Sequence, residues 1–360
     1  MSNTTTPAAN LLEFGGFAIP AGCRRIFITA ELEPSNGDPR IQPTGFPDIG
    51  PVLYPDPAEE DGLICLIESE ASMANRLEEV CFSNKYEGTL KGSFAGLPYL
   101  KAAKAGVLKT ASTLDGHRFA SDFLAKCKGD FGNGEKTLAQ HIKDTLGMTA
   151  DGKTMPIARV PEMFSLVLGL DAMSLIHGFQ ISNEQISFVG LRMARALSAS
   201  IIGMGCERVS IPGIKFNVGQ VESESGQAIF QKPRITAKKI EARFSIDVGL
   251  LASLRLDTPG ENGDPGPLQS ARVQLLLAIA LWKVAAFLDL LSVELSLRTE
   301  CKLRLKNHTS PTARCEGGRE ACSVDFPFAT ITAASLSGAD SLFARASLPA
   351  NRSPLTLQFA

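Results

Sequence analysis

The stretch ESEASMANRLEEVC, Glu68 to Cys81, follows the apolar run LICLI, Leu63 to Ile67, without a break. A short apolar run is typical of a buried strand, and the hydroxyl of Ser69 can accept a hydrogen bond from a free backbone N–H at a helix start. The next apolar side chains recur at helical spacing on one face: Met73, Leu77, Val80 and Cys81. The sequence therefore predicts a strand that runs directly into a helix.

The flank of this helix carries a polar stripe, formed by Ser72, Asn75, Arg76 and Glu79. A solvated helix side would have the same composition. Hydroxyl, amide and guanidinium donors side by side would also suit an anionic ligand such as a phosphodiester backbone. Ser72, Asn75 and Arg76 are therefore candidate nucleic-acid contacts.

Length and composition indicate a folded, globular protein. The chain has 360 residues, 44% of them hydrophobic and 21% charged, which is enough for a large core in one elaborated domain or two. Its net charge of -2 gives no overall basic signature. Any binding of nucleic acid must therefore use local basic surfaces.

Several features favour a cytoplasmic protein without a metal, a cofactor or a membrane partner. The eight cysteines include no CxxC pair, and the gaps between His308, Cys315 and Cys322 are wide for a zinc site. The N-terminal residues MSNTTTPAAN do not resemble a signal peptide. Lys283 and Asp289 interrupt the most apolar segment, Leu275 to Leu291, so a buried helix is expected there.

Alternating residues predict strands elsewhere in the chain. Cys23 to Glu33 has one apolar face, and its other face carries Arg25 and Phe27. A cation and an aromatic ring are what an RNA-binding sheet uses, although a mixed polar face would look the same. Lys239 to Val248 and Leu297 to Lys306 alternate as strictly.

The remaining segments suggest a loop, a helix, an insertion and a hairpin. Pro34 to Pro57 is a structured loop. Ser182 or Asn183 can cap a helix that places Arg192 and Arg195 together on its polar side. The Lys-rich segment 82–155, with a helix around 136–145, is interpreted as an insertion. A protruding β-hairpin is predicted over 205–234, and between residues 205 and 243 seven Lys or Arg outnumber four Glu.

Together these elements predict an α+β domain with a largely antiparallel sheet, helices on one face and the other face open. This is an RRM-like (ferredoxin-like) core with insertions. No phosphate-binding loop, dinucleotide fingerprint, metalloprotease motif or serine-hydrolase motif is present. The sequence therefore indicates binding rather than catalysis.

Four segments together resemble one CRISPR protein family: RIFITAELEPS (Arg25 to Ser35), IQPTGFPDIG (Ile41 to Gly50), ESEASMANRLE (Glu68 to Glu78) and LRMARALSASIIG (Leu191 to Gly203). The family is the backbone subunit of the type I-U, or I-G, Cascade complex and belongs to the RAMP superfamily. The similarity is strong over the first 80 residues and in the middle of the chain, and weak in the Lys-rich insertion and at the C-terminus. The family usually has Gln where this chain has Glu70 or Ala71.

The resemblance implies a palm of RRM-like fold with a finger insertion and a thumb β-hairpin. Residues 1–81 would form the first part of the palm, 82–155 the fingers, 156–204 a helical part of the palm, 205–234 the thumb, and 235–360 the rest of the palm and a tail. Copies of such a subunit polymerise head to tail along a guide RNA (crRNA), and the thumb displaces one base. The implied role is to support pairing of the guide with target DNA, without catalysis.

The resemblance also implies partners and contacts. The partners are other copies of the chain, the crRNA-processing and cap subunits, the large subunit, and a helicase-nuclease recruited later. Ile214 and Phe216 are candidates for the wedge of the thumb. The candidate RNA contacts are Arg25, Phe27, Thr44, Phe46, Ser72, Asn75, Arg76, Arg192, Arg195, Lys215, Lys232, Arg234, Lys238 and Lys239.

Two alternatives remain open at this point. Related subunits of type III complexes cut target RNA with an acidic loop residue, and Asp48 or Asp38 would serve a metal-dependent ribonuclease of the same fold. A small-molecule enzyme would instead use an apolar pocket beside His177, where a packed, hydrogen-bonded histidine is the expectation.

Overall fold

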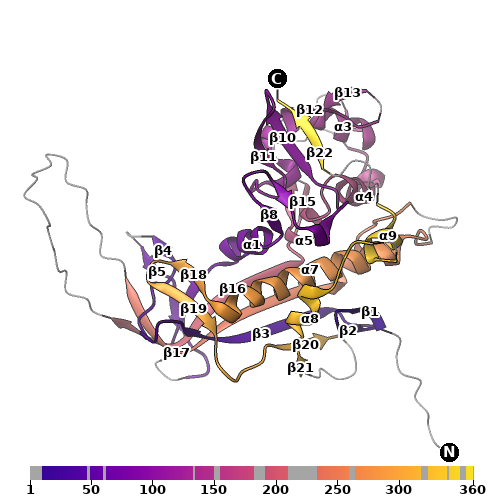
Figure 1. The fold of residues 1–360 in the computed structure, drawn as a ribbon. Coiled ribbons are helices and arrows are strands. Elements are labelled where there is room, and N and C mark those ends of the chain that lie inside the picture. Colours follow the sequence, from indigo (N-terminus) through magenta and orange to yellow (C-terminus); the bar gives the residue numbers. More distant parts are fainter. Residues whose placement is uncertain are drawn as a thin grey trace, which may run out of the picture.

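The computed structural model describes residues 10–46, 49–59, 62–132, 134–149, 155–181, 191–209, 233–258, 264–317, 323–338, 340–348 and 354–359. These residues form a mixed α+β fold with a long lower sheet and a smaller upper body (Figure 1).

The lower sheet contains β3 (Arg25–Pro34), β6 (Leu53–Pro55), β7 (Leu63–Glu68), β16 (Leu197–Val209), β17 (Arg234–Asp247), β18 (Leu295–Arg298), β19 (Cys301–Leu305), β20 (Thr312–Glu316) and β21 (Ser323–Asp325). Its order is β18-β19-β3-β17-β16-β7-β6, with β20 paired to β3 and β21 to β20. The strands predicted over 23–33, 63–67 and 239–248 are confirmed as β3, β7 and part of β17.

Two helices cover one face of this sheet, α1 (Glu70–Glu79) and α7 (Gln269–Val293) (Figure 1). The hydroxyl of Ser69 accepts a hydrogen bond from the backbone N–H of Ser72 at 3.4 Å, and Met73 and Leu77 are fully buried, so the predicted helix is confirmed. α7 is apolar on all sides because it lies between the sheet and the upper body. By length and composition it could span a membrane, but 78% of its apolar window is buried inside the protein, as in a core helix.

The lower sheet and its helices follow a simple connectivity. In chain order, β3, α1, β16, β17, α7 and β19 alternate as strand, helix, strand, strand, helix and strand. In space the four strands stand in the order β19-β3-β17-β16, and every neighbour is antiparallel. The face opposite the helices carries the half-buried side chains of β3, which alternate with the buried Ile26, Ile28, Ala30 and Leu32.

The upper body contains a five-stranded sheet in the order β11-β10-β22-β12-β13. Its strands are β10 (Leu100–Lys104), β11 (Val107–Ala111), β12 (Lys128–Asp130), β13 (Glu135–Thr137) and β22 (Leu355–Gln358). Its helices are α2 (Asp122–Lys126), α3 (Leu138–Thr145), α4 (Val160–Leu170) and α5 (Ser174–His177). The helix predicted around 136–145 is confirmed as α3.

The strand β22 comes from a distant part of the chain and stands in the middle of this sheet. It pairs in parallel with β10 and antiparallel with β12. A Cβ added at Gly129 of β12 would come within 2.6 Å of Leu357 Cδ2, so glycine permits the close approach of the two strands.

The other elements are short. The hairpin strands are β1 (Asn10–Phe14), β2 (Phe17–Pro20), β4 (Gly45–Phe46), β5 (Gly50–Pro51), β8 (Phe82–Asn84), β9 (Thr89–Leu90), β14 (Phe179–Ile181) and β15 (Leu191–Met193). The helical turns are α6 (Val248–Ser253), α8 (Phe328–Ala333), α9 (Leu342–Ala346), η1 (Gly92–Phe94), η2 (Arg118–Ala120) and η3 (Ile157–Arg159).

Two expectations from the sequence are wrong. The helix expected to run from Ser182 to Leu197 is not formed in its described part, where β15 and the start of β16 are strands, because pairing with β14 and β17 overrides the helical spacing. Arg192 and Arg195 therefore share no helix face. The stretch 297–306 is not one strand either, since β18 and β19 form a hairpin that turns at Thr299 and Glu300.

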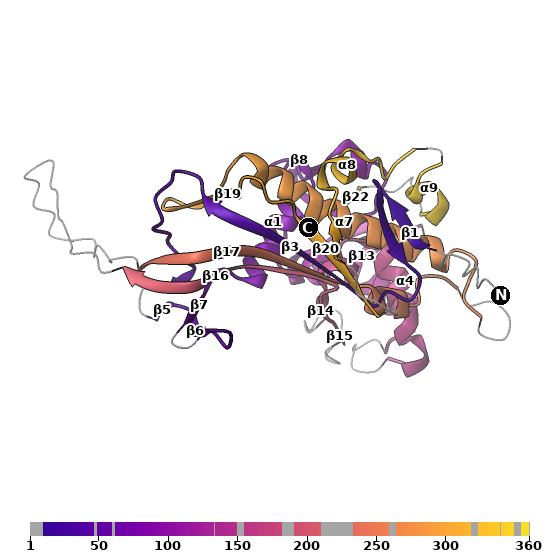
Figure 2. The same cartoon turned by 90° about the horizontal axis from the view of Figure 1, so that it is seen from below.

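The long hairpin of β16 and β17 is in register from Leu197 opposite Ile246 to Val209 opposite Arg234. Figure 2 shows both strands running side by side toward one end of the sheet. Most of the hairpin predicted over 205–234, with Lys215, Lys232, Ile214 and Phe216, lies outside the described residues.

Candidate nucleic-acid interface

A buried carboxylate at the end of β7 holds two arginines where α1 begins. Glu68 is 1% exposed. Arg298 Nη1 donates a hydrogen bond to Glu68 Oε2 at 2.7 Å. Arg76 Nε lies 3.6 Å from Glu68 Oε1, which is an ion pair but too long for a hydrogen bond. Two positive charges around one negative charge leave this cluster, Glu68, Arg76 and Arg298, with one net positive charge.

Arg298 also ties a loop to this cluster. Its Nε donates to the carbonyl of Gln42 at 3.0 Å and its Nη2 to the carbonyl of Ile67 at 2.5 Å. The backbone N–H of Thr44 donates to the same Ile67 carbonyl at 3.1 Å. The candidate Thr44 is therefore held beside the start of α1.

The polar stripe of α1 starts at this cluster. Asn75 is exposed and Ser72 is half-buried. The Arg76 side chain is 23% exposed, and its Nη2 donates to the carbonyl of Leu297 at 3.3 Å. The Nε–H of Arg76 has no hydrogen-bond acceptor within the described part of the chain. Ser72, Asn75 and Arg76 therefore lie on one flank of α1, near a helix N-terminus that carries partial positive charge.

Arg25 and Phe27 lie on the opposite face of the sheet from α1, because they alternate with the side chains of β3 that face the helices. Arg25 forms an ion pair with Asp247 at 2.5 Å. The Arg314 guanidinium lies 5.4 Å from the centre of the Phe27 ring. The structure therefore does not bring Arg25 and Phe27 together with the stripe on α1.

The cations on that opposite face are already paired with carboxylates. Lys239 and Arg243 both pair with Glu241, at 2.6 and 2.7 Å. Burial alone would raise the pKa of Glu241, but hydrogen bonds from these two cations hold it below its usual value. Lys306 forms an ion pair with Glu31 at 2.5 Å. Phosphate would have to displace these carboxylates to reach the cations.

The candidates at the base of the long hairpin are also engaged. Lys238 pairs with Glu59 at 3.1 Å, and Arg234 pairs with Glu300. Arg192 and Arg195 are exposed on and after β15. The side chain of Phe46 lies outside what the structure describes, as do Lys215 and Lys232.

Of the two acidic residues considered for a nuclease, Asp38 and Asp48, the structure describes only Asp38. Asp38 is bound by Arg40, whose hydrogen bonds lower the pKa of the Asp38 carboxyl to about 2. Asp48 lies outside the described residues. Within the described ranges, no group of three or more His, Cys, Asp or Glu residues is arranged to hold a metal ion.

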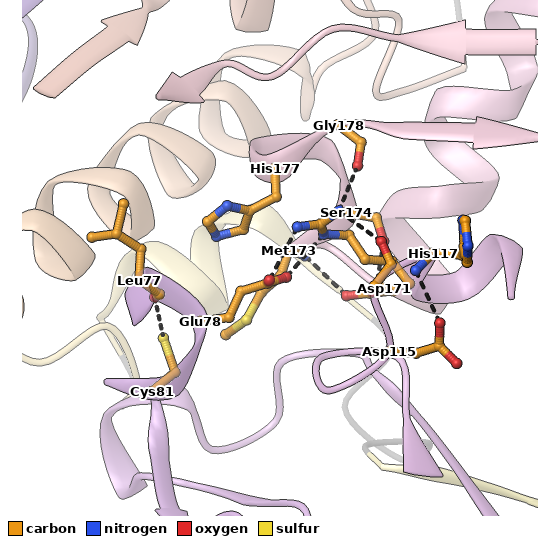
Figure 3. A network of polar contacts seen from close by, with 12 residues as sticks. Leu77, Glu78, Cys81, Asp115, His117, Asp171, Met173, Ser174, His177 and Gly178 are labelled. Atoms are coloured by element: carbon orange, nitrogen blue, oxygen red, sulfur yellow. Dashed lines mark hydrogen bonds and ion pairs between the residues drawn. The ribbon is translucent and has the colours of Figure 1, made fainter. Parts of the chain in front are cut away.

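His177 belongs to a buried polar network that joins α1 and α7 to the upper body (Figure 3). Its Nε2 lies 2.8 Å from Lys283 Nζ, and it is 1% exposed. Beside it, Arg118 donates to both carboxylate oxygens of Glu78, at 2.9 and 3.0 Å, and to the carbonyl of Gly178 at 3.4 Å. The expectation of a packed, hydrogen-bonded histidine is confirmed.

Sequence reasoning missed Arg298 and Arg118. Arg298 lay in an alternating stretch that resembled a simple strand, and its role depends on contacts with Gln42 and Glu68 more than 200 residues away in the chain. Arg118 likewise depends on a contact with Glu78, 40 residues away in the chain. No local pattern in the sequence could have identified either residue.

Comparison with known proteins defines the class of this protein as CRISPR-associated. The model of the family CRISPR-associated protein GSU0053 (Cas_GSU0053) matches residues 26–208, just over half of the chain. The chain belongs to this family. The crystal structure of Thermofilum pendens Csc2 is similar at 11% identity, with a TM-score of 0.31, over 87% of this chain and 72% of that one. No curated protein matches this chain.

Proposed function

We propose that this protein is the guide-RNA-binding backbone subunit of a type I-G (I-U) CRISPR complex and a member of the RAMP superfamily. In this role it polymerises head to tail on crRNA and supports pairing with target DNA, without catalysing a reaction. The observation that carries the proposal is the positively charged cluster of Glu68, Arg76 and Arg298 beside the polar stripe of α1, in a chain of a CRISPR-associated family.

The chemistry of this site fits a guide of any sequence. A subunit that holds every guide must contact phosphate and ribose rather than base edges. The site offers hydroxyl, amide and guanidinium donors, from Thr44, Ser72, Asn75 and Arg76. Each of these groups can donate a hydrogen bond to a phosphodiester oxygen. The cations at the base of the hairpin, which carboxylates already engage, would have a secondary role.

The connectivity supports the proposed palm, whereas α4, α5 and β22, which the expected bounds assign to the palm and its tail, lie in the upper body. The strand order β19-β3-β17-β16, with α1 and α7 on one face, has the arrangement of a ferredoxin-like palm. The hairpin of β16 and β17 would be the thumb, and the upper sheet would belong to the fingers. A head-to-tail contact does not close on itself, so it would build a filament. The crRNA-processing, cap and large subunits, a later helicase-nuclease and a cytoplasmic location belong to the same proposal.

The test is co-expression of the chain with its partner subunits and a CRISPR array. The purified complex is examined by the ratio of its absorbance at 260 and 280 nm, and extracted nucleic acid is sized. We expect RNA of uniform guide length with the wild type and its loss with Asn75→Ala/Arg76→Ala. The control is Arg159→Ala, which removes an exposed cation that pairs with Glu162 at 2.6 Å in the upper body. Protein free of RNA in the presence of the array would refute the proposal.

The same complex tests for nuclease activity. Labelled target RNA is incubated with it in the presence of Mg²⁺. We expect no discrete cleavage. Cleavage that Asp48→Ala abolishes would replace the binding role with that of a ribonuclease.

A further inference from the structure

Arg118 of η2, in the upper body, holds α1 through Glu78, a residue of the helix outside the polar stripe. Its Nε and Nη2 donate to the two carboxylate oxygens of Glu78 at 2.9 and 3.0 Å, and its Nη1 donates to the carbonyl of Gly178 at 3.4 Å (Figure 3). The side chains of Arg118 and Glu78 are each 8% exposed. Such a two-point bond fixes direction as well as distance, because the planar guanidinium must align with the carboxylate.

The backbone of Arg118 has a conformation that residues with a side chain rarely adopt. Its φ of 55° lies in the left-handed region. Asp115 ties the surrounding turn together, because its carboxylate accepts hydrogen bonds from the backbone N–H of His117 at 2.9 Å and from the hydroxyl of Ser121 at 2.7 Å. A strained residue persists only where its surroundings hold it, and such residues are common at functional sites. The turn therefore presents Arg118 to α1 in one fixed orientation.

The polar stripe lies on the same short helix as Glu78. α1 has ten residues, and Asn75 and Arg76 precede Glu78 by less than one turn. Apolar side chains hold α1 against the core, but apolar packing has no preferred direction. On the flank of the stripe, Arg76 lies 3.6 Å from Glu68, which is longer than either bond from Arg118 to Glu78. Arg118 is therefore the firmer polar support for the orientation of α1.

We propose that Arg118 is a positioning residue for RNA binding: by holding Glu78 it fixes the orientation of α1 and so places Asn75 and Arg76 against the RNA backbone. The inference rests on the proposed function and extends it to the upper body. Arg118 itself does not contact phosphate in this role, because its side chain is buried and its three nitrogens already donate to Glu78 and to backbone carbonyls. Loosening Arg118 should therefore weaken RNA binding only through the stripe.

A matched pair of variants tests this role. Arg118→Lys keeps the positive charge beside Glu78 but lacks the planar fork that matches both carboxylate oxygens. The control is Arg272→Lys, because Arg272 pairs with Asp257 at 3.0 Å and donates to the carbonyls of Leu256 and Ala346, where it ties the start of α7 to α9. Both variants keep the charge and should fold, which circular dichroism and urea denaturation check. We expect guide RNA to bind roughly fivefold more weakly to Arg118→Lys and to bind normally to Arg272→Lys.

A double-mutant cycle separates positioning from a general structural role. Arg118→Lys is combined with Arg76→Ala, and the affinity of the complex for labelled guide RNA is measured by fluorescence anisotropy at low salt, where weakened binding stays measurable. Residues that act independently contribute additively. Because Arg118 acts through the stripe, Arg118→Lys should reduce the affinity by a smaller factor in the Arg76→Ala background than in the wild type.

Hydrogen exchange gives a readout that needs no variant. If RNA on the stripe and Arg118 hold α1 together, guide RNA should slow amide exchange in η2 of the wild-type complex.

The outcomes separate this inference from the proposed function. Equal RNA affinity of Arg118→Lys and Arg272→Lys, the same loss from Arg118→Lys in both backgrounds, or unchanged exchange in η2 would refute the positioning role and leave the guide-binding role intact. Absence of RNA from the wild-type complex would refute both.

Discussion

The two arginines that share Glu68 are not equivalent. Arg298 also donates hydrogen bonds to two backbone carbonyls, whereas Arg76 donates to one and lies 3.6 Å from the carboxylate. Arg298 therefore holds the local structure together. Arg76 is left with bonding capacity for a ligand.

This difference predicts unequal losses of stability for two substitutions. Arg298→Ala should lower the free energy of unfolding by about 3 kcal/mol, because it leaves a buried carboxylate without its hydrogen-bonded partner. Arg76→Ala should lower it by about 1 kcal/mol or less, since Arg298 still pairs with Glu68. Urea denaturation of both variants measures the values. Equal losses would show that Arg76 is a structural residue.

His177 predicts a dependence of stability on pH. Burial, together with the positive charges of Lys283, Arg118 and Arg195, lowers the pKa of His177 well below 6.5 in the folded protein. Below pH 6.5 the unfolded chain therefore takes up a proton that the folded protein does not, and stability falls as the pH decreases. Between pH 7 and pH 5.5 this group should lower the free energy of unfolding by about 1 kcal/mol.

The matched variant for this prediction is His177→Gln, which keeps an acceptor for Lys283 but does not titrate. Urea denaturation at both pH values should show a smaller loss in the variant than in the wild type. An identical loss in the two proteins would mean that other groups set the pH dependence.

At the scale of the element, α1 and β22 show what the sequence can reveal. The start of α1 was predictable because its cap, Ser69, and its apolar spacing are local features. The hairpin of β18 and β19 was missed because the alternation continues through its turn. The place of β22 could not be predicted either, since a four-residue strand carries little pattern and its partners lie more than 200 residues away.

The position of β22 predicts a local effect of a core substitution. Leu357 is fully buried in the upper sheet. Leu357→Ala should destabilise this sheet by about 3 kcal/mol through the cavity it leaves. Hydrogen exchange should become faster in β10 and β12, while α7 stays protected. Gln358→Ala, an exposed neighbour on the same strand, is the control, and faster exchange throughout the protein would contradict a local role.

At the scale of the whole molecule, the lower sheet has clustered cations on both of its sides. On the open face Lys239 and Arg243 share Glu241, and at the start of α1 Arg76 and Arg298 share Glu68, so each of these groups has one net positive charge. The sequence predicted the cation and the aromatic ring on the open face correctly. It could not show that Asp247 pairs with Arg25 and that Arg314 lies over the Phe27 ring, because those contacts form only in the folded sheet.

This distribution predicts how RNA binding depends on salt. The logarithm of the binding constant for guide RNA should fall linearly with the logarithm of the salt concentration, because each phosphate contact releases counterions. Arg76→Ala, which keeps Asn75, should reduce the slope by about 1, the contribution of one phosphate contact. Fluorescence anisotropy with labelled guide RNA measures the slope. A slope equal to that of Arg159→Ala would place Arg76 away from phosphate.

The order in which the ribosome delivers the chain has a consequence for the upper sheet. β10 to β13 leave the exit tunnel about 200 residues before β22 does. At ~5–20 residues per second, the two hairpins wait roughly 10–40 s with their facing edges unpaired. During this interval they are exposed to pairing with other nascent chains. The lower sheet, whose strand β20 is translated well before β22, can be complete while the upper body is still open to chaperones.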